Sequence, residues 1–101
     1  MSLVTVVIAT TTDVALGAGI SFGQYDYSIL AADGVTVVQE GKSAALTFAF
    51  PADVPAGSYT AVAQALDSTG AKLGTSATAA FTVVAAPTTF AQPATLTVTV
   101  A

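Results

Sequence analysis

The acidic side chains are the first residues of this sequence to consider for chemistry, and they are Asp13, Asp26, Asp33, Glu40, Asp53 and Asp67. A glycoside hydrolase needs two carboxyl groups that face each other across a cleft, one of them with a raised pKa. Asp33 and Asp67 instead lie beside Gly or Ser in turn-like segments, where hydrogen bonds to nearby backbone explain a carboxylate. These acids therefore predict turns rather than a catalytic pair.

Missing residue types exclude several other activities. The chain has no Cys and no His, which removes thiolate nucleophiles, imidazole bases and the usual ligands of zinc, haem and iron–sulfur clusters. A calcium site needs several oxygen ligands, but no loop carries two closely spaced acids, and Asp13 and Asp53 would meet only through the tertiary fold. Gly17-Ala18-Gly19 lacks the following Lys and helix of a phosphate loop and predicts a bend or bulge. We expect no enzymatic activity, no catalytic residue, no cofactor, no metal site and no small-molecule substrate.

The charge balance limits the partners. Two Lys against six acids give a net charge of −4, which argues against nucleic acid and anionic membranes. No run of the sequence approaches the roughly 20 apolar residues of a membrane-spanning helix. The first residues lack the basic segment of an export signal. The sequence thus predicts either a gene product that stays in the cytoplasm where it is made, or a module excised from a longer protein.

Apolar residues recur with the two-residue period of β-strands, and no 3.6-residue stripe persists. The expected strands cover residues 3–9, 20–22, 25–30, 35–40, 44–50, 58–66 and 77–84. In the first of them both faces are apolar, which is typical of a strand covered on both sides. Asp33-Gly34 and Asp67-Ser68-Thr69-Gly70 predict turns, and residues 51–57 predict a loop. The fold class is all-β.

The C-terminal part predicts a connector followed by one more strand. Residues 85–93 contain two prolines and read as an extended connector. Residues 94–101 alternate Leu96, Val98 and Val100 with threonines. This terminal strand either folds back onto its own sheet or adds to a neighbour's sheet edge. Phe90 either docks on a partner or caps the edge of its own domain.

About seven short strands at spacings near 8–12 residues are typical of a β-sandwich, here over residues 1–84. The stretch from Tyr25 to Val84 resembles bacterial and phage immunoglobulin-like domains of the Big and fibronectin-III-like kind. The resemblance is carried by Tyr25-Asp26-Tyr27-Ser28-Ile29-Leu30 with Asp33-Gly34, by Pro55-Ala56-Gly57-Ser58-Tyr59-Thr60-Ala61-Val62, and by Ala80-Phe81-Thr82-Val83. It implies an immunoglobulin-like β-sandwich of about seven antiparallel strands plus the extra terminal strand. It also implies a tyrosine corner, in which the Tyr59 hydroxyl bonds to backbone a few residues upstream. The structural residues expected from these segments are Tyr59, Asp33, Gly34 and Gly57.

The low charge content indicates a protein that works in an assembly. Charged residues make up 8% of the chain, whereas roughly 25–35% of the surface residues of a soluble, monomeric protein are charged. A β-sheet surface without charges does little to prevent pairing between the edge strands of two molecules. We expect a non-enzymatic structural protein whose partners are other copies of itself, a major capsid protein or a surface protein. The resemblance favours a phage capsid decoration or cement protein, found on the virion. The alternative is a module of a bacterial surface adhesin or pilus. The expected partner-binding residues are Phe90, Leu96, Val98 and Val100.

Overall fold

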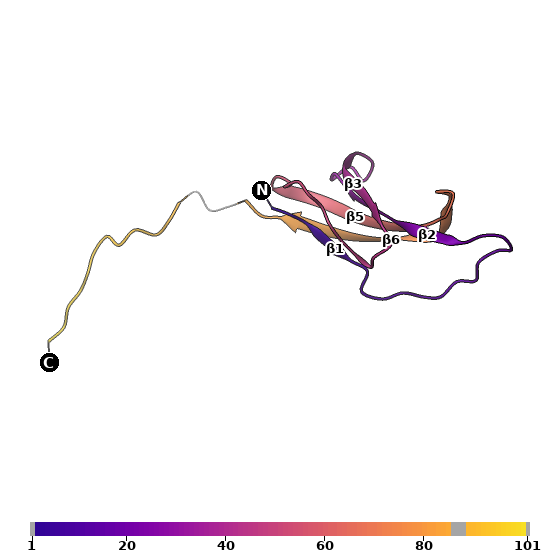
Figure 1. Ribbon diagram of the computed structural model, residues 1–101. Coiled ribbons are helices and arrows are strands. Elements are labelled where there is room, and N and C mark those ends of the chain that lie inside the picture. Colours follow the sequence, from indigo (N-terminus) through magenta and orange to yellow (C-terminus); the bar gives the residue numbers. More distant parts are fainter. Residues whose placement is uncertain (1, 86–88, 101) are drawn as a thin grey trace.

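The computed structural model describes residues 2–85 and 89–100 (Figure 1). These residues contain six strands and no helix, so the prediction of an all-β protein is confirmed. The strands are β1 (Thr5–Val7), β2 (Phe22–Leu30), β3 (Val37–Ser43), β4 (Thr47–Ala49), β5 (Gly57–Asp67) and β6 (Lys72–Val83).

Two antiparallel sheets make up the fold. The larger sheet has the order β3-β2-β5-β6, and the smaller consists of β1 and β4. Tyr27 of β2 lies opposite Gly41 on one side and Ala63 on the other, which fixes the register of the large sheet. In the small sheet Val6 lies opposite Phe48. Beyond it, Ser2 forms an isolated bridge with Val54.

The hydrophobic core lies between the two sheets. Its buried members are Tyr27, Ile29, Phe50, Val54, Tyr59 and Val83. Val4, Val6 and Ile8, every second residue of the first segment, pack against them. The Phe48 ring stacks on Tyr27, with ring centres 5.3 Å apart. A Cβ atom at Gly41 would overlap the Phe48 ring, so glycine is required where the two sheets meet there.

Both predicted turns are present. Gly34 has a φ of 74° and Gly70 a φ of 90°, which L side chains rarely adopt. The Asp33 Oδ1 atom accepts hydrogen bonds from the Val35 and Thr36 amides. The Asp67 Oδ1 atom accepts them from the Thr69 and Ala71 amides. Short-range chemistry therefore fixes both turns.

Several boundaries differ from the sequence prediction. β1 and β4 are shorter than residues 3–9 and 44–50, whereas β6 begins at Lys72, before the predicted residue 77. The first segment is covered on one side only, because Leu3 is 68% and Val7 63% exposed. The prediction of two covered faces was wrong, since no layer among residues 2–85 and 89–100 packs on the outer side of the two-stranded sheet.

The predicted terminal strand is absent from the described residues. Residues 94–100 form no strand and pair with neither sheet, and they extend away from the strands, as Figure 1 shows. Ala101 and residues 86–88 of the predicted connector lie outside the described residues. Alternation alone gave the segment strand character, but a strand also needs a partner for its backbone groups.

Candidate interaction surface

The large sheet is only partly covered, and this leaves an open groove between β1 and β6. The groove is about 190 Å³ where residues 6–10 face residues 61–63 and 77–79. It continues into a wider hollow of about 720 Å³ between the loop after β1 and the end of β5 and start of β6. The two-stranded layer therefore covers only part of the four-stranded layer.

Small side chains line the floor of this groove. Ala61 and Ala63 of β5 lie opposite Ala79 and Ala77 of β6 in the register of the sheet. They lie on the same sheet face as Tyr27 and Ile29, because those residues pair with Ala63 and Ala61. Tyr27 and Ile29 are buried, whereas Ala77 and Ala79 are exposed. The core face of the large sheet thus continues to β6, where Val83 is buried but the described residues leave Ala77 and Ala79 uncovered.

The outer edge of β1 borders the groove with free backbone groups. The Phe50 amide donates to the Val4 carbonyl, and the Ile8 amide donates to the Leu46 carbonyl. Backbone groups of alternate residues point to opposite sides of a strand. Those of Thr5 and Val7 therefore point away from β4, toward the open edge. A further strand could hydrogen-bond there.

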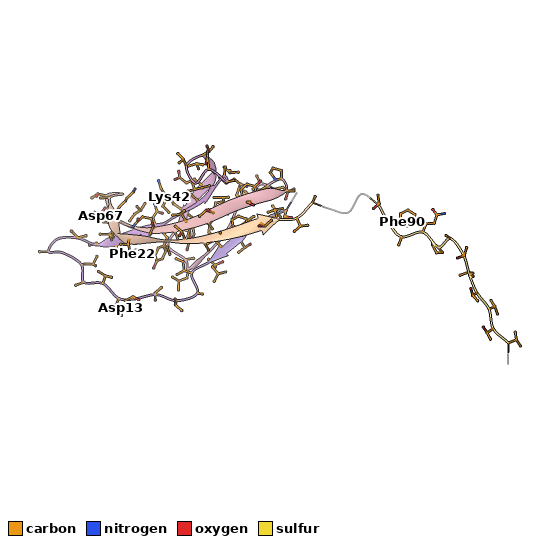
Figure 2. All side chains as sticks on the ribbon, turned by 180° about the vertical axis from the view of Figure 1, so that it is seen from behind. Asp13, Phe22, Lys42, Asp67 and Phe90 are labelled. Carbon is orange, nitrogen blue, oxygen red and sulfur yellow. The ribbon has the colours of Figure 1, made fainter. Side chains whose placement is uncertain are left out.

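The predicted partner-binding residues all lie in the extended tail formed by residues 89–100. Phe90 is 81% exposed, Leu96 and Val100 are 88% exposed, and Val98 is 84% exposed. Figure 2 shows Phe90 far from the strands. Phe90 therefore does not cap an edge of its own domain in this structure. The tail presents these apolar side chains to its surroundings.

The predicted structural residues lie in the body of the fold. The Tyr59 hydroxyl donates a hydrogen bond of 2.6 Å to the Pro55 carbonyl, the geometry that the resemblance implies. Its ring stacks on Phe81 with centres 5.6 Å apart. Gly57, with a φ of 155°, begins β5 beneath this ring. Hydrogen bonds from Thr36 and Val35 lower the pKa of Asp33 to about 2.

Three charged side chains, Asp26, Glu40 and Lys42, lie near one another on the large sheet. Asp26 lies on the outer face of the large sheet, and burial, followed by the nearby Glu40 carboxylate, raises its pKa. Lys42, directly opposite Asp26 in the register, acts against that shift. Hydrogen bonds from Thr69 and Ala71 lower the pKa of Asp67. No group of three or more acids that could hold a metal ion occurs in the described parts of the chain.

Sequence reasoning missed the groove itself. It located the tail but not the exposed alanines of β6, Ala77 and Ala79, or their neighbours Ala61 and Ala63 in β5. One signal was present, because residues 77, 79, 61 and 63 are all Ala on the face that carries Tyr27 and Ile29 in the neighbouring strand. These four small side chains at neighbouring core-facing positions are the sequence feature that accompanies the groove.

Comparison with known proteins identifies no relatives. The chain matches no protein-family model, no curated protein and no solved structure. Over residues 2–85 and 89–100 there is also no helix of the length and hydropathy needed to cross a membrane.

Proposed function

We propose that this protein is a non-enzymatic structural subunit that binds a repeated protein lattice, as a decoration or cement protein on a phage capsid. The observation that carries the proposal is the amount of apolar surface left uncovered on a chain with so few charges. Leu3, Val7, Leu96 and Val98 are all exposed, and only two Lys and six acids are available to keep copies apart. Exposed apolar surface of this kind marks interaction sites.

An immunoglobulin-like sandwich of the fibronectin-III-like kind is the finer fold that we propose. Three features support it: the strand order β3-β2-β5-β6, the facing β1-β4 pair, and the Tyr59 corner. Such sandwiches host many unrelated tasks, so the fold agrees with a virion role without specifying it. Relative to a seven-strand sandwich, one strand is missing beside β1 in the described residues.

Binding to a lattice requires little affinity for each contact. Where many copies attach to a repeated surface, or one copy attaches at two points, the second contact forms at high effective concentration. The body and the tail offer two separate sets of apolar side chains for such contacts. The protein would then strengthen or cover the lattice without chemical catalysis.

The second candidate is a subunit or module of a bacterial surface adhesin or pilus. The specific observation that favours it is the unpaired, alternating tail. An extended segment of this kind can add a strand to the sheet of a neighbouring subunit. Under this proposal the protein is located on the cell surface rather than on the virion.

Quantitative cross-linking mass spectrometry of native material separates these roles. Lys42 and Lys72 are exposed and provide the amine-reactive positions. Cross-links to a major capsid protein in purified particles, at many copies per particle, would support the virion role. Cross-links to cell-envelope proteins would support the alternative. A protein found in neither fraction, without neighbours, would refute the structural role.

A further inference from the structure

We infer that the groove between β1 and β6 receives residues 95–100 of a second copy of this chain, which pair with the free edge of β1 as a seventh strand. The inference extends the proposed structural role from a lattice to contacts between copies. It concerns two features already on one chain: an open two-layer fold and an unpaired strand-like segment. Its test uses the purified chain alone, so that its failure is distinct from a failure of lattice binding.

The exposed Ala77 and Ala79 indicate that the seventh strand would belong to the smaller sheet, beside β1. A strand added to the outer edge of β6 would extend the large sheet and leave Ala77 and Ala79 uncovered, because their side chains point toward the opposite layer. A strand added beside β1 would lie above them. It would also bond the backbone groups of Thr5 and Val7 that point away from β4. Only a strand beside β1 would both cover the exposed alanines and bond the free backbone groups of β1.

The tail has the pattern and length that this position needs. Leu96, Val98 and Val100 alternate with Thr95, Thr97 and Thr99, so one face of the strand is apolar and the other polar. Large apolar side chains on the incoming strand complement the small alanines of the floor. Six residues of strand extend about 20 Å, enough to run along Thr5 and the residues from Val6 to Thr10 that line the groove.

Strand direction favours a second copy over the tail of the same chain. Residues 6–10 and 77–79 line the groove, and residues 10–17 and 73–77 line its wider continuation, so β1 and β6 run in opposite directions. β6 ends at Val83 near Ser2, because Gly57 pairs with Val83 and Ser2 bridges Val54 (Figure 1). A tail that folded back directly from there, without first crossing to the far end of β1, would run parallel to β1. A tail that arrives from another copy at the opposite end runs antiparallel to β1, the more stable pairing.

The resulting contact is head-to-tail. Each copy donates its tail and accepts another, so association does not close after two copies unless the geometry forms a ring. We therefore expect concentration-dependent oligomers of the purified chain in sedimentation velocity experiments. This behaviour follows from the chain itself and needs no capsid or envelope protein.

Two matched pairs of variants test the contact. Val98→Asp places a charge on the apolar face of the tail, and Thr97→Asp places the same charge on its polar face. Ala79→Asp obstructs the groove, and Ala80→Asp changes the next residue, on the opposite face of β6. Because the groove would bury an unpaired carboxylate, Val98→Asp and Ala79→Asp should each weaken self-association by at least about tenfold. The two controls should change it by less than about threefold.

A second measurement locates the contact. A synthetic peptide of residues 93–101 is titrated into the isotope-labelled full-length Val98→Asp chain, and amide shifts are recorded. We expect shifts at Thr5, Val7 and Ala77–Ala79, and none when the peptide itself carries Val98→Asp. The inference is wrong if the unmodified chain stays monomeric at all concentrations, if control and test variants behave alike, or if the peptide shifts only β3. A monomer that still binds its lattice would refute strand exchange and leave the structural role standing.

Discussion

The hydroxyl of Tyr59 offers a sharp test of how this fold is held together. Replacing Tyr59 by Phe keeps the ring that stacks on Phe81 and removes one hydrogen bond, the 2.6 Å contact to the Pro55 carbonyl. That contact joins the loop before β5 to the strand itself. The substitution therefore measures the corner without altering the packing of the core.

The magnitude follows from the surroundings of the two partners. The Tyr59 ring is only 8% exposed, but Pro55 lies at the surface, so water can replace the lost donor at its carbonyl. The cost is then the net value of one hydrogen bond, about 1 kcal/mol, rather than the larger penalty of a buried unpaired group. For a domain of this size, about 1 kcal/mol lowers the Tm by roughly 4–8 °C.

Urea denaturation followed by circular dichroism measures this difference. A loss of about 1 kcal/mol shifts the midpoint by roughly 0.3–1 M, with the slope unchanged. Tyr25→Phe is the matched control, because it removes a hydroxyl from the same sheet face without touching the corner, and it should cost less. Equal effects of the two substitutions, or no effect of Tyr59→Phe, would show that the corner contributes nothing to stability.

Three further substitutions probe packing and charge. Gly41→Ala forces a Cβ atom into the Phe48 ring and should lower the free energy of unfolding by about 1–3 kcal/mol; an unchanged urea midpoint would contradict the contact between the sheets. Asp33 has a folded pKa of about 2, below its usual 3.8, so its stabilising contribution is present above about pH 4 and is lost as the pH falls toward 2. Asp33→Asn should therefore reduce the acid-induced loss of stability between pH 4 and 2, and parallel pH profiles of the two proteins would contradict this. Burial and Glu40 raise the pKa of Asp26, so the charged form of Asp26 is disfavoured in the folded state. The free energy of unfolding of Asp26→Asn, relative to that of the unmodified chain, should therefore rise as the pH increases from 4 to 7. A difference between the two proteins that stays constant with pH would contradict the raised pKa.

Local chemistry accounts for the parts of the fold that the sequence predicted well. Asp33-Gly34 and Asp67–Gly70 specify turns because each Asp bonds backbone amides within four residues and each Gly supplies a positive φ. The strands that flank those turns, β2, β3, β5 and β6, follow from the alternation on either side of them. The β2–β3 and β5–β6 pairings join neighbours along the chain, which the turns already indicate, whereas the β2–β5 pairing joins strands that β3 and β4 separate in the sequence.

The incorrect predictions concern pairings that local pattern does not determine. Leu3-Val4-Thr5-Val6-Val7 and Leu96-Thr97-Val98-Thr99-Val100 have almost the same strand character, yet only the first finds a partner in the structure, β4. Propensity describes how well a residue suits a pleated surface and does not say which strand lies beside it. The groove was missed for the same reason. Whether a sheet face is covered depends on how many strands the second layer contains, and local pattern does not determine that number.

The position of the tail also decides which end of the molecule is presented outward. The tail leaves the fold at the end where Ser2 bridges Val54, and the turn at Asp67–Gly70 lies at the other end, as the labels of Asp67 and Phe90 show in Figure 2. A copy held by its tail would project that turn away from the surface to which it is attached. A peptide inserted between Thr69 and Gly70 would then be displayed far from the anchor, whereas a tag fused at the first residues would lie beside it.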